Sequence, residues 1–131
     1  MLFETLTRKI IGAAFTVYNK MGFGYLEKVY EKCMLIELEK IDGIDVKCQC
    51  PIKVEYEGVD VGDFVADFIV ENEIVIEIKS VHHVLPIHEM QLVNYLNASG
   101  LDLGLLINFG ESKVDIRRKL RKLPGNCNKA K

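Results

Sequence analysis

The stretch from Asp63 to Ser80, DFVADFIVENEIVIEIKS, places three charged residues where two apolar strands are expected. Its Val, Ile and Phe runs flank the polar residues 71–73, a pattern that predicts a hairpin. Asp67, Glu77 and Lys79 interrupt these runs. An unpaired carboxylate inside a buried strand costs several kcal/mol or is forced to neutralise. Residue chemistry alone leaves two interpretations open: a salt bridge of Glu77 with Lys79 or Asp67 at a wet end of the sheet, or a functional site.

The length of the turn decides which face of the sheet Asp67 occupies. Glu77 and Lys79 must share a face because side chains alternate along a strand. A loop of three residues would pair Val70 with Ile74 and place Asp67 opposite Glu77, whereas a loop of two would place Asp67 on the other face. In the first register two carboxylates lie about 5 Å apart at Cβ, with the lysine one pleat beyond. Such an arrangement can hold Mg²⁺ and orient or activate one of its waters.

Length, composition and charge fit an ordinary globular protein. The 131 residues predict a single domain over residues 1–120, followed by a basic C-terminal tail over residues 121–131. No apolar run reaches the length of about 18 that crosses a membrane, and the first residues lack the order of a secretory signal, so we expect a cytoplasmic location and no membrane partner. The net charge of −2 does not indicate nucleic-acid binding. The basic segment Arg117–Lys122 is either solvated or a phosphate-binding edge.

Hydrophobic periodicity predicts the remaining elements. Helices are expected over residues 3–21, 25–40 and 87–98, and strands over residues 46–56 and 103–109, the last one parallel to the strand that precedes the third helix. The second helix is expected to bury Leu26, Val29, Cys33 and Ile36, and the strand over residues 46–56 to be interrupted at Pro51. Residues 114–120 are compatible with either a short edge strand or a basic helix.

The order of these motifs resembles a known nuclease superfamily. A first-helix glutamate, a strand with Asp67, a strand with Glu77-Ile78-Lys79 and a helix with Gln91-x-x-x-Tyr95 look like the PD-(D/E)XK nucleases. The segment Gly24-Tyr25-Leu26-Glu27-Lys28-Val29-Tyr30 is similar to the signature of the GxxExxY family within that superfamily. The resemblance covers almost the whole chain, with Ala66 standing where a proline usually precedes the aspartate.

The resemblance implies an α/β fold with a restriction-endonuclease-like core. Its mixed central sheet, a three-stranded antiparallel meander plus a further strand, is flanked by helices. It also implies Mg²⁺ (or Mn²⁺) bound by Asp67, Glu77, the main-chain carbonyl of Ile78 and Glu27. Lys79 would position or activate water, which completes a catalytic set of Asp67, Glu77, Lys79 and Glu27. Gln91 and Tyr95 would contact the nucleic acid or support the lysine.

Two main functions are expected from these observations. The first is a metal-dependent nuclease that hydrolyses phosphodiester bonds, with DNA preferred to RNA, in repair, recombination or defence. A domain this small offers little surface for base reading, so specificity would need a homodimer or a partner protein. The second is a non-catalytic interaction or scaffold module that keeps a nuclease-like fold. A metal-dependent hydrolase of nucleotides is a third, less favoured interpretation.

Overall fold

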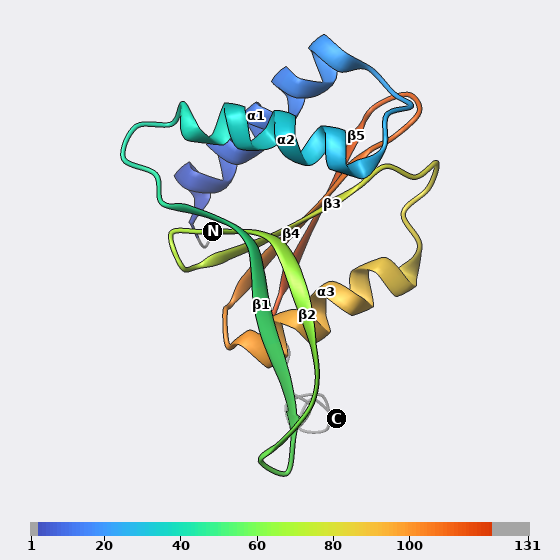
Figure 1. Cartoon of the computed structure of the whole chain (residues 1–131). Coiled ribbons are helices and arrows are strands. Elements are labelled where there is room, and N and C mark those ends of the chain that lie inside the picture. Colours follow the sequence, from blue (N-terminus) through green and yellow to red (C-terminus); the bar gives the residue numbers. More distant parts are fainter. Residues whose placement is uncertain (1–2, 122–131) are drawn as a thin grey trace.

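The computed structural model describes residues 3–121, in which two helical layers enclose one sheet (Figure 1). The helices are α1 (Glu4–Met21), α2 (Glu27–Glu39) and α3 (Pro86–Ser99), and the strands are β1 (Val46–Tyr56), β2 (Val59–Val70), β3 (Ile74–Lys79), β4 (Leu103–Phe109) and β5 (Val114–Leu120). The predicted basic tail lies outside the described residues except for Arg121. None of the described helices is long and apolar enough to cross a membrane.

The sheet has the mixed topology that the sequence predicts. Its strands follow the order β1-β2-β3-β4-β5, in which β2 is antiparallel to both β1 and β3, and β4 is parallel to β3. The crossover from β3 to β4 carries α3, as a parallel connection requires. Residues 114–120 form an edge strand antiparallel to β4, so the alternative of a basic helix is wrong.

The hairpin between β2 and β3 has the register of a three-residue loop. Val70 pairs with Ile74, and Glu71 and Asn72 adopt positive φ angles of 55° and 54° in the turn. The prediction of this register is confirmed. Because side chains alternate along β3, Ile74, Ile76 and Ile78 face one side of the sheet and Glu77 and Lys79 the other.

The two faces of the sheet bury separate cores. Helices α1 and α2 pack on the face that carries Ile76 and Leu105, and α3 packs Leu92 and Leu96 on the opposite face. The layer of α1 and α2 lies above the sheet in Figure 1 and α3 lies below it, next to the long β1–β2 hairpin. This division matters for the site, because Glu77 and Lys79 point to the face of α3 whereas α2 approaches from the other side.

Two details of the sequence interpretation are wrong. The predicted core stripe of α2 is out of phase, since Leu26 is 79% and Ile36 58% exposed, and the helix instead buries Tyr30, Glu31, Met34 and Leu38. The stripe of α2 also includes a charged residue, which a search for apolar periodicity passes over. The strand β1 runs through Pro51, which pairs with Val65; its irregularities lie instead at Gln49, which has a positive φ, and between Val54 and Glu55, where the register shifts.

Candidate active site

Asp67 lies at the point where β2 separates from β3. The backbone pairs of these strands end at Phe68 and Ile76, although β2 continues to pair with β1. The Oδ2 atom of Asp67 accepts a hydrogen bond from the backbone N–H of Ile78 at 2.7 Å. The carboxylate therefore replaces the backbone acceptor that the diverging strand no longer supplies, and it is held beside Glu77.

Glu77 has a buried carboxylate oxygen with no hydrogen-bond partner among the described residues. The atom is Oε1, and it lacks any donor within reach. Burial, and secondly the charge of Asp67, raise the pKa of Glu77 to about 8. Buried polar atoms without a partner are rare and costly in folded proteins. Two adjacent carboxylates, one with an unsatisfied oxygen, and the main-chain carbonyl of Ile78 are oxygen donors of the kind that Mg²⁺ or Mn²⁺ prefers, since these ions bind oxygen and keep several waters.

Lys79 is the cation next to this pair of carboxylates. It is half-buried, and it lowers the pKa of both Asp67 and Glu77 against the larger effect of burial. No ion pair within 4.0 Å joins Lys79 to either carboxylate in the described part of the chain, so the salt bridge considered from the sequence is not formed. The ammonium group is close enough to act on the site electrostatically without being bound to it.

The chain after Lys79 is fixed by a buried asparagine on β4. Asn108 pairs in register with Lys79 and is 1% exposed. Its side-chain Oδ1 accepts from the N–H of Val81 at 2.9 Å, and its Nδ2 donates to the carbonyl of Val81 at 2.8 Å. These two bonds satisfy the buried amide and hold the loop that leaves β3, which limits the freedom of Lys79.

A carboxyl group from α2 reaches the site, and it belongs to Glu31. Glu31 is 8% exposed, and its carboxyl group shares a hydrogen bond with that of Asp67. Burial, followed by the charge of Asp67, raises the pKa of Glu31. Glu27 is the first residue of α2, one turn earlier, where it lines a cavity with Ser80. Within residues 3–121, no group of three or more His, Cys, Asp and Glu side chains is arranged to hold a metal ion.

Gln49 is the second residue of the site that sequence reasoning missed. Its Nε2 donates to Oε1 of Glu31 at 2.7 Å. Its φ of 51° lies in the left-handed region, and it is absent from the pairs of β1 with β2, although Cys48 and Cys50 pair on either side. The irregularity falls opposite Asp67. A non-glycine residue with this φ is uncommon, and no motif in the sequence marks it.

The α3 residues that the sequence singles out have different positions. Tyr95 stacks on Phe64 with ring centroids 3.3 Å apart, and Glu77 and Asp67 both act to raise the pKa of its phenol, after the larger effect of burial. Tyr95 therefore lies beside the carboxylates. Gln91 is exposed and makes no hydrogen bond to another described residue.

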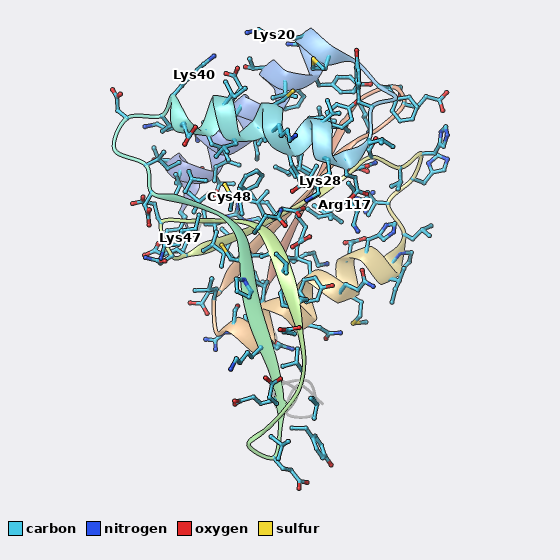
Figure 2. All side chains as sticks on the ribbon, viewed as in Figure 1. Lys20, Lys28, Lys40, Lys47, Cys48 and Arg117 are labelled. Carbon is cyan, nitrogen blue, oxygen red and sulfur yellow. The ribbon has the colours of Figure 1, made fainter. Side chains whose placement is uncertain are left out.

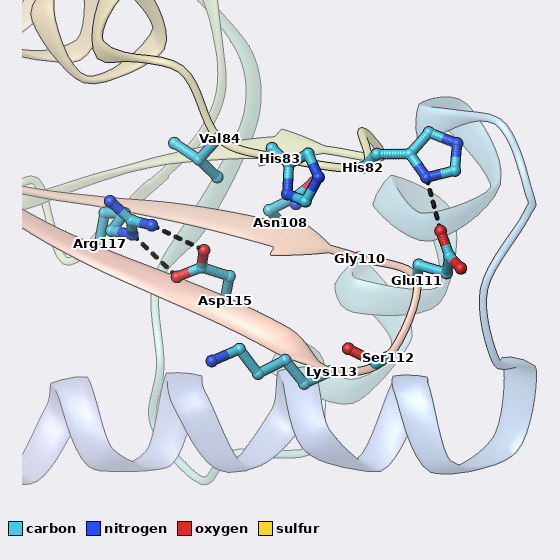
Figure 3. A pocket seen from close by; sticks show the side chains of 10 residues that line it. All are labelled: His82, His83, Val84, Asn108, Gly110, Glu111, Ser112, Lys113, Asp115 and Arg117. Atoms are coloured by element: carbon cyan, nitrogen blue, oxygen red, sulfur yellow. Dashed lines mark hydrogen bonds and ion pairs between the residues drawn. The ribbon is translucent and has the colours of Figure 1, made fainter.

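Arg117 of β5 lines a cavity of about 470 Å³ that also contains Asn108, and this arginine is already held in ion pairs. In Figure 3, two contacts of 2.8 and 2.9 Å join Arg117 to Asp115, and His82 contacts Glu111. The ion pairs at β5 and its end are Arg117 with Asp115 and Glu89, Lys119 with Glu89, and Arg121 with Asp102. Arg117, Lys119 and Arg121 therefore do not support the interpretation of this segment as a phosphate-binding edge with free cations.

The buried carboxyl of Glu77 predicts that the metal-free protein loses stability as pH rises. Below about pH 4.5, Glu77 is protonated in both the folded and the unfolded protein. Between that pH and about 8 only the unfolded chain releases the proton, so the free energy of unfolding falls by up to about 1.4 kcal/mol per pH unit. Urea unfolding in EDTA is expected to give a falling stability from pH 5 to pH 8 and a flatter profile for Glu77→Gln. Equal slopes for the two proteins would contradict the burial of this carboxyl.

Comparisons with known proteins agree with this architecture. The model of one protein family, the PD-(D/E)XK nuclease superfamily, matches residues 4–119. The crystal structure of SSO0001 is similar to this chain with a TM-score of 0.57 and 19% sequence identity, over 76% of this chain and 52% of that one. This chain thus spans about half the length of that protein, and at this identity the similarity shows the fold alone. No curated protein matches the chain.

Proposed function

The chain belongs to the PD-(D/E)XK nuclease superfamily, and from this premise we propose that it is a divalent-metal-dependent nuclease that hydrolyses phosphodiester bonds in DNA. Nucleases of this superfamily generally depend on a divalent metal. The signature from Gly24 to Tyr30 supports placing the chain in the GxxExxY family within it. We expect Mg²⁺ or Mn²⁺ as the metal, a cytoplasmic location, and a role in repair, recombination or defence.

The observation that carries this proposal is the unsatisfied Oε1 of Glu77 beside Asp67. We assign the metal-binding oxygens to these two carboxylates and to the main-chain carbonyl of Ile78. A divalent cation bound there would polarise the phosphate and supply an acidified water. Asp67 is fixed by the N–H of Ile78, so its carboxylate is presented to a metal in one orientation.

We assign two roles to Lys79: it orients the attacking water, and it stabilises the negative charge that develops on the phosphate. Its Nζ lies on the same strand face as Glu77, and no ion pair to a described residue fixes it elsewhere. An ammonium group in this position can donate a hydrogen bond to a phosphate oxygen or orient the water for in-line attack. Tyr95 would support the lysine from α3, and exposed Gln91 would contact the nucleic acid.

The first-helix carboxylate has two candidates one turn apart. The superfamily resemblance assigns the role to Glu27, and the contact with Asp67 favours Glu31. Glu31→Gln keeps the size of the side chain and removes its ionisable carboxyl group, and Glu27→Gln is its matched control on the same helix. If Glu31 supports the metal ligands, calorimetric titration with Mn²⁺ will show at least about a tenfold loss of affinity for Glu31→Gln, by analogy with other residues that orient ligands. A larger loss of Mn²⁺ affinity in Glu27→Gln than in Glu31→Gln would instead assign the role of the first-helix carboxylate to Glu27.

Titration with Mn²⁺ also separates a nuclease from a scaffold. A nuclease predicts binding that Asp67→Asn and Glu77→Gln each abolish, together with Mn²⁺-dependent cleavage of mixed DNA and RNA substrates. A scaffold module predicts neither. Cleavage of RNA alone would overturn the assignment of DNA. A homodimer or a partner protein would extend the small binding surface of the domain, and light scattering with and without DNA would detect the dimer.

A further inference from the structure

The helix α2 carries exposed lysines near the site, whereas Arg117 and Lys119 of β5 are held in ion pairs. Lys28 is 70% exposed, and its Nζ lies 3.7 Å from Oε1 of Glu31. Apart from Lys79, it is the cation that lowers the pKa of Asp67 against the effect of burial. Figure 2 marks Lys28 on α2 and Arg117 on β5. A long contact and a mostly exposed side chain leave the ammonium of Lys28 available to a ligand.

Two cavities meet at Lys28. One, of about 530 Å³, is lined by Tyr25, Leu26, Glu27 and by Ser80, the residue after Lys79. The other, of about 160 Å³, lies between α2 and β1 and is lined by Glu31, Gln49 and Lys32. Lys28 lines both, so the two cavities adjoin over the first two turns of α2, where the carboxyl group of Glu31 contacts Asp67. Lys32 is exposed and lies four residues after Lys28, on the same side of the helix.

An exposed aromatic ring lies at one end of this path. Tyr25 is 46% exposed and Leu26 79% exposed, both at the cavity beside Ser80. The ring of Tyr25 rests edge-on against buried Tyr30, with centroids 6.0 Å apart, which limits its motion. Aromatic faces and lysines along a groove are the features that bind a single strand of nucleic acid, because bases stack on the rings and phosphates contact the cations.

The other exposed projection of the domain is unsuited to a polyanion. Residues 53–63 at the tip of the β1–β2 hairpin contain four acidic residues and one lysine, and that lysine, Lys53, lies 3.9 Å from Asp60. In Figure 1 this tip extends away from α2 and from the site. Phosphates would be repelled there, whereas the path over α2 combines exposed lysines with proximity to Asp67.

We propose that a single strand of nucleic acid crosses the first two turns of α2, with a base stacked on Tyr25 and phosphates on Lys28 and Lys32. This inference rests on the proposed nuclease function and names the form of its substrate. The strand would approach the site from the side of Asp67, where the ammonium of Lys28 offsets the repulsion between substrate phosphates and that carboxylate.

Binding to fluorescein-labelled oligothymidylate and oligouridylate, measured by anisotropy in EDTA over a range of KCl, tests this path without requiring cleavage. Lys28→Ala and Lys32→Ala are each expected to weaken binding several-fold and to lower the slope of log K against log salt by about 0.7. Tyr25→Ala should weaken binding by about fivefold or more, as expected for loss of one stacked base. The two oligonucleotides distinguish DNA from RNA as the strand.

The matched control is Lys40→Ala at the far end of α2, where Lys40 pairs with Glu37 at 3.0 Å and no loss is expected. The path would be overturned if the slope of log K against log salt were unchanged in the α2 variants, or lowered in Lys119→Ala instead. It would also be overturned if the wild type did not bind, or if it bound duplex in a way that Tyr25→Ala does not affect. Mn²⁺-dependent cleavage is measured in parallel. Binding that depends on these lysines without any cleavage would refute the nuclease while leaving the path in place.

Discussion

Lys79→Ala is expected to lower the rate of metal-dependent cleavage by about 100-fold or more, with little change in the fold. General acid–base groups and preorganised donors at a reacting phosphate typically contribute factors of this size. Lys79 is half-buried on β3, beside Asp67 and Glu77, and no described ion pair holds it. Its removal therefore eliminates a positive charge from the reacting centre without breaking a structural contact. Single-turnover cleavage at saturating Mn²⁺ measures the effect.

The controls for Lys79→Ala separate chemistry from metal binding. Titration with Mn²⁺ should show that the variant still binds the metal, since Asp67 and Glu77 are unchanged. Lys53→Ala, on the distant hairpin tip, is the matched loss of one lysine and should cleave at the wild-type rate. Equal cleavage by Lys79→Ala and wild type would show that the lysine has no catalytic role, and loss of Mn²⁺ binding would move its role to assembly of the site.

The sequence was sufficient for the parts of the site that lie on one hairpin. The register of Val70 with Ile74 depends on local turn geometry and on the alternation of side chains, both of which are properties of neighbouring residues. The positions of Glu77 and Lys79 on one face follow from that register. The parallel strand β4 was also predictable, because an apolar run after a helix has few alternative placements.

The contribution of α2 could not be predicted in the same way. Its burial pattern includes Glu31, which is tolerated because Gln49 and Lys28 supply contacts from β1 and from the same helix. Apolar periodicity assigns such a residue to solvent and shifts the expected stripe toward Leu26. The left-handed backbone of Gln49 is likewise set by tertiary contacts, since glutamine has no intrinsic preference for it.

Of the two interpretations that residue chemistry left open, a salt bridge and a functional site, the structure favours the functional site. A salt bridge at a wet sheet end would place Lys79 in contact with a carboxylate, and would leave Glu77 solvated. The structure instead buries Glu77 with an unpartnered oxygen and keeps Lys79 apart from both acids. This arrangement is unfavourable for an isolated domain without a ligand, and functional sites are where such unfavourable arrangements are retained.

Tyr30→Ala is expected to destabilise the domain by about 3–5 kcal/mol, the range for deleting a fully buried aromatic ring. Tyr30 is 0% exposed and stacks on Phe109 at 4.4 Å with an interplanar angle of 2°. Its hydroxyl donates to the carbonyl of Gly22, which ties the turn after α1 to the start of α2. Loss of the ring removes both the packing of α2 on β4 and this tie. Urea unfolding measures the change in the free energy of unfolding.

The same substitution should disturb the site, because Glu31 follows Tyr30 directly on α2. Tyr30→Phe keeps the ring and loses only the two hydrogen bonds of the hydroxyl, to the carbonyl of Gly22 and from the N–H of Tyr25, so it is expected to cost about 1–2 kcal/mol and to leave Mn²⁺ affinity nearly unchanged. Phe15→Ala, at a residue 46% exposed on α1, controls for loss of an aromatic ring outside the core and should cost much less. If Tyr30→Ala bound Mn²⁺ as tightly as Tyr30→Phe under conditions where both are folded, the site would be formed by the β2–β3 hairpin without α2, and the support assigned to Glu31 would be wrong.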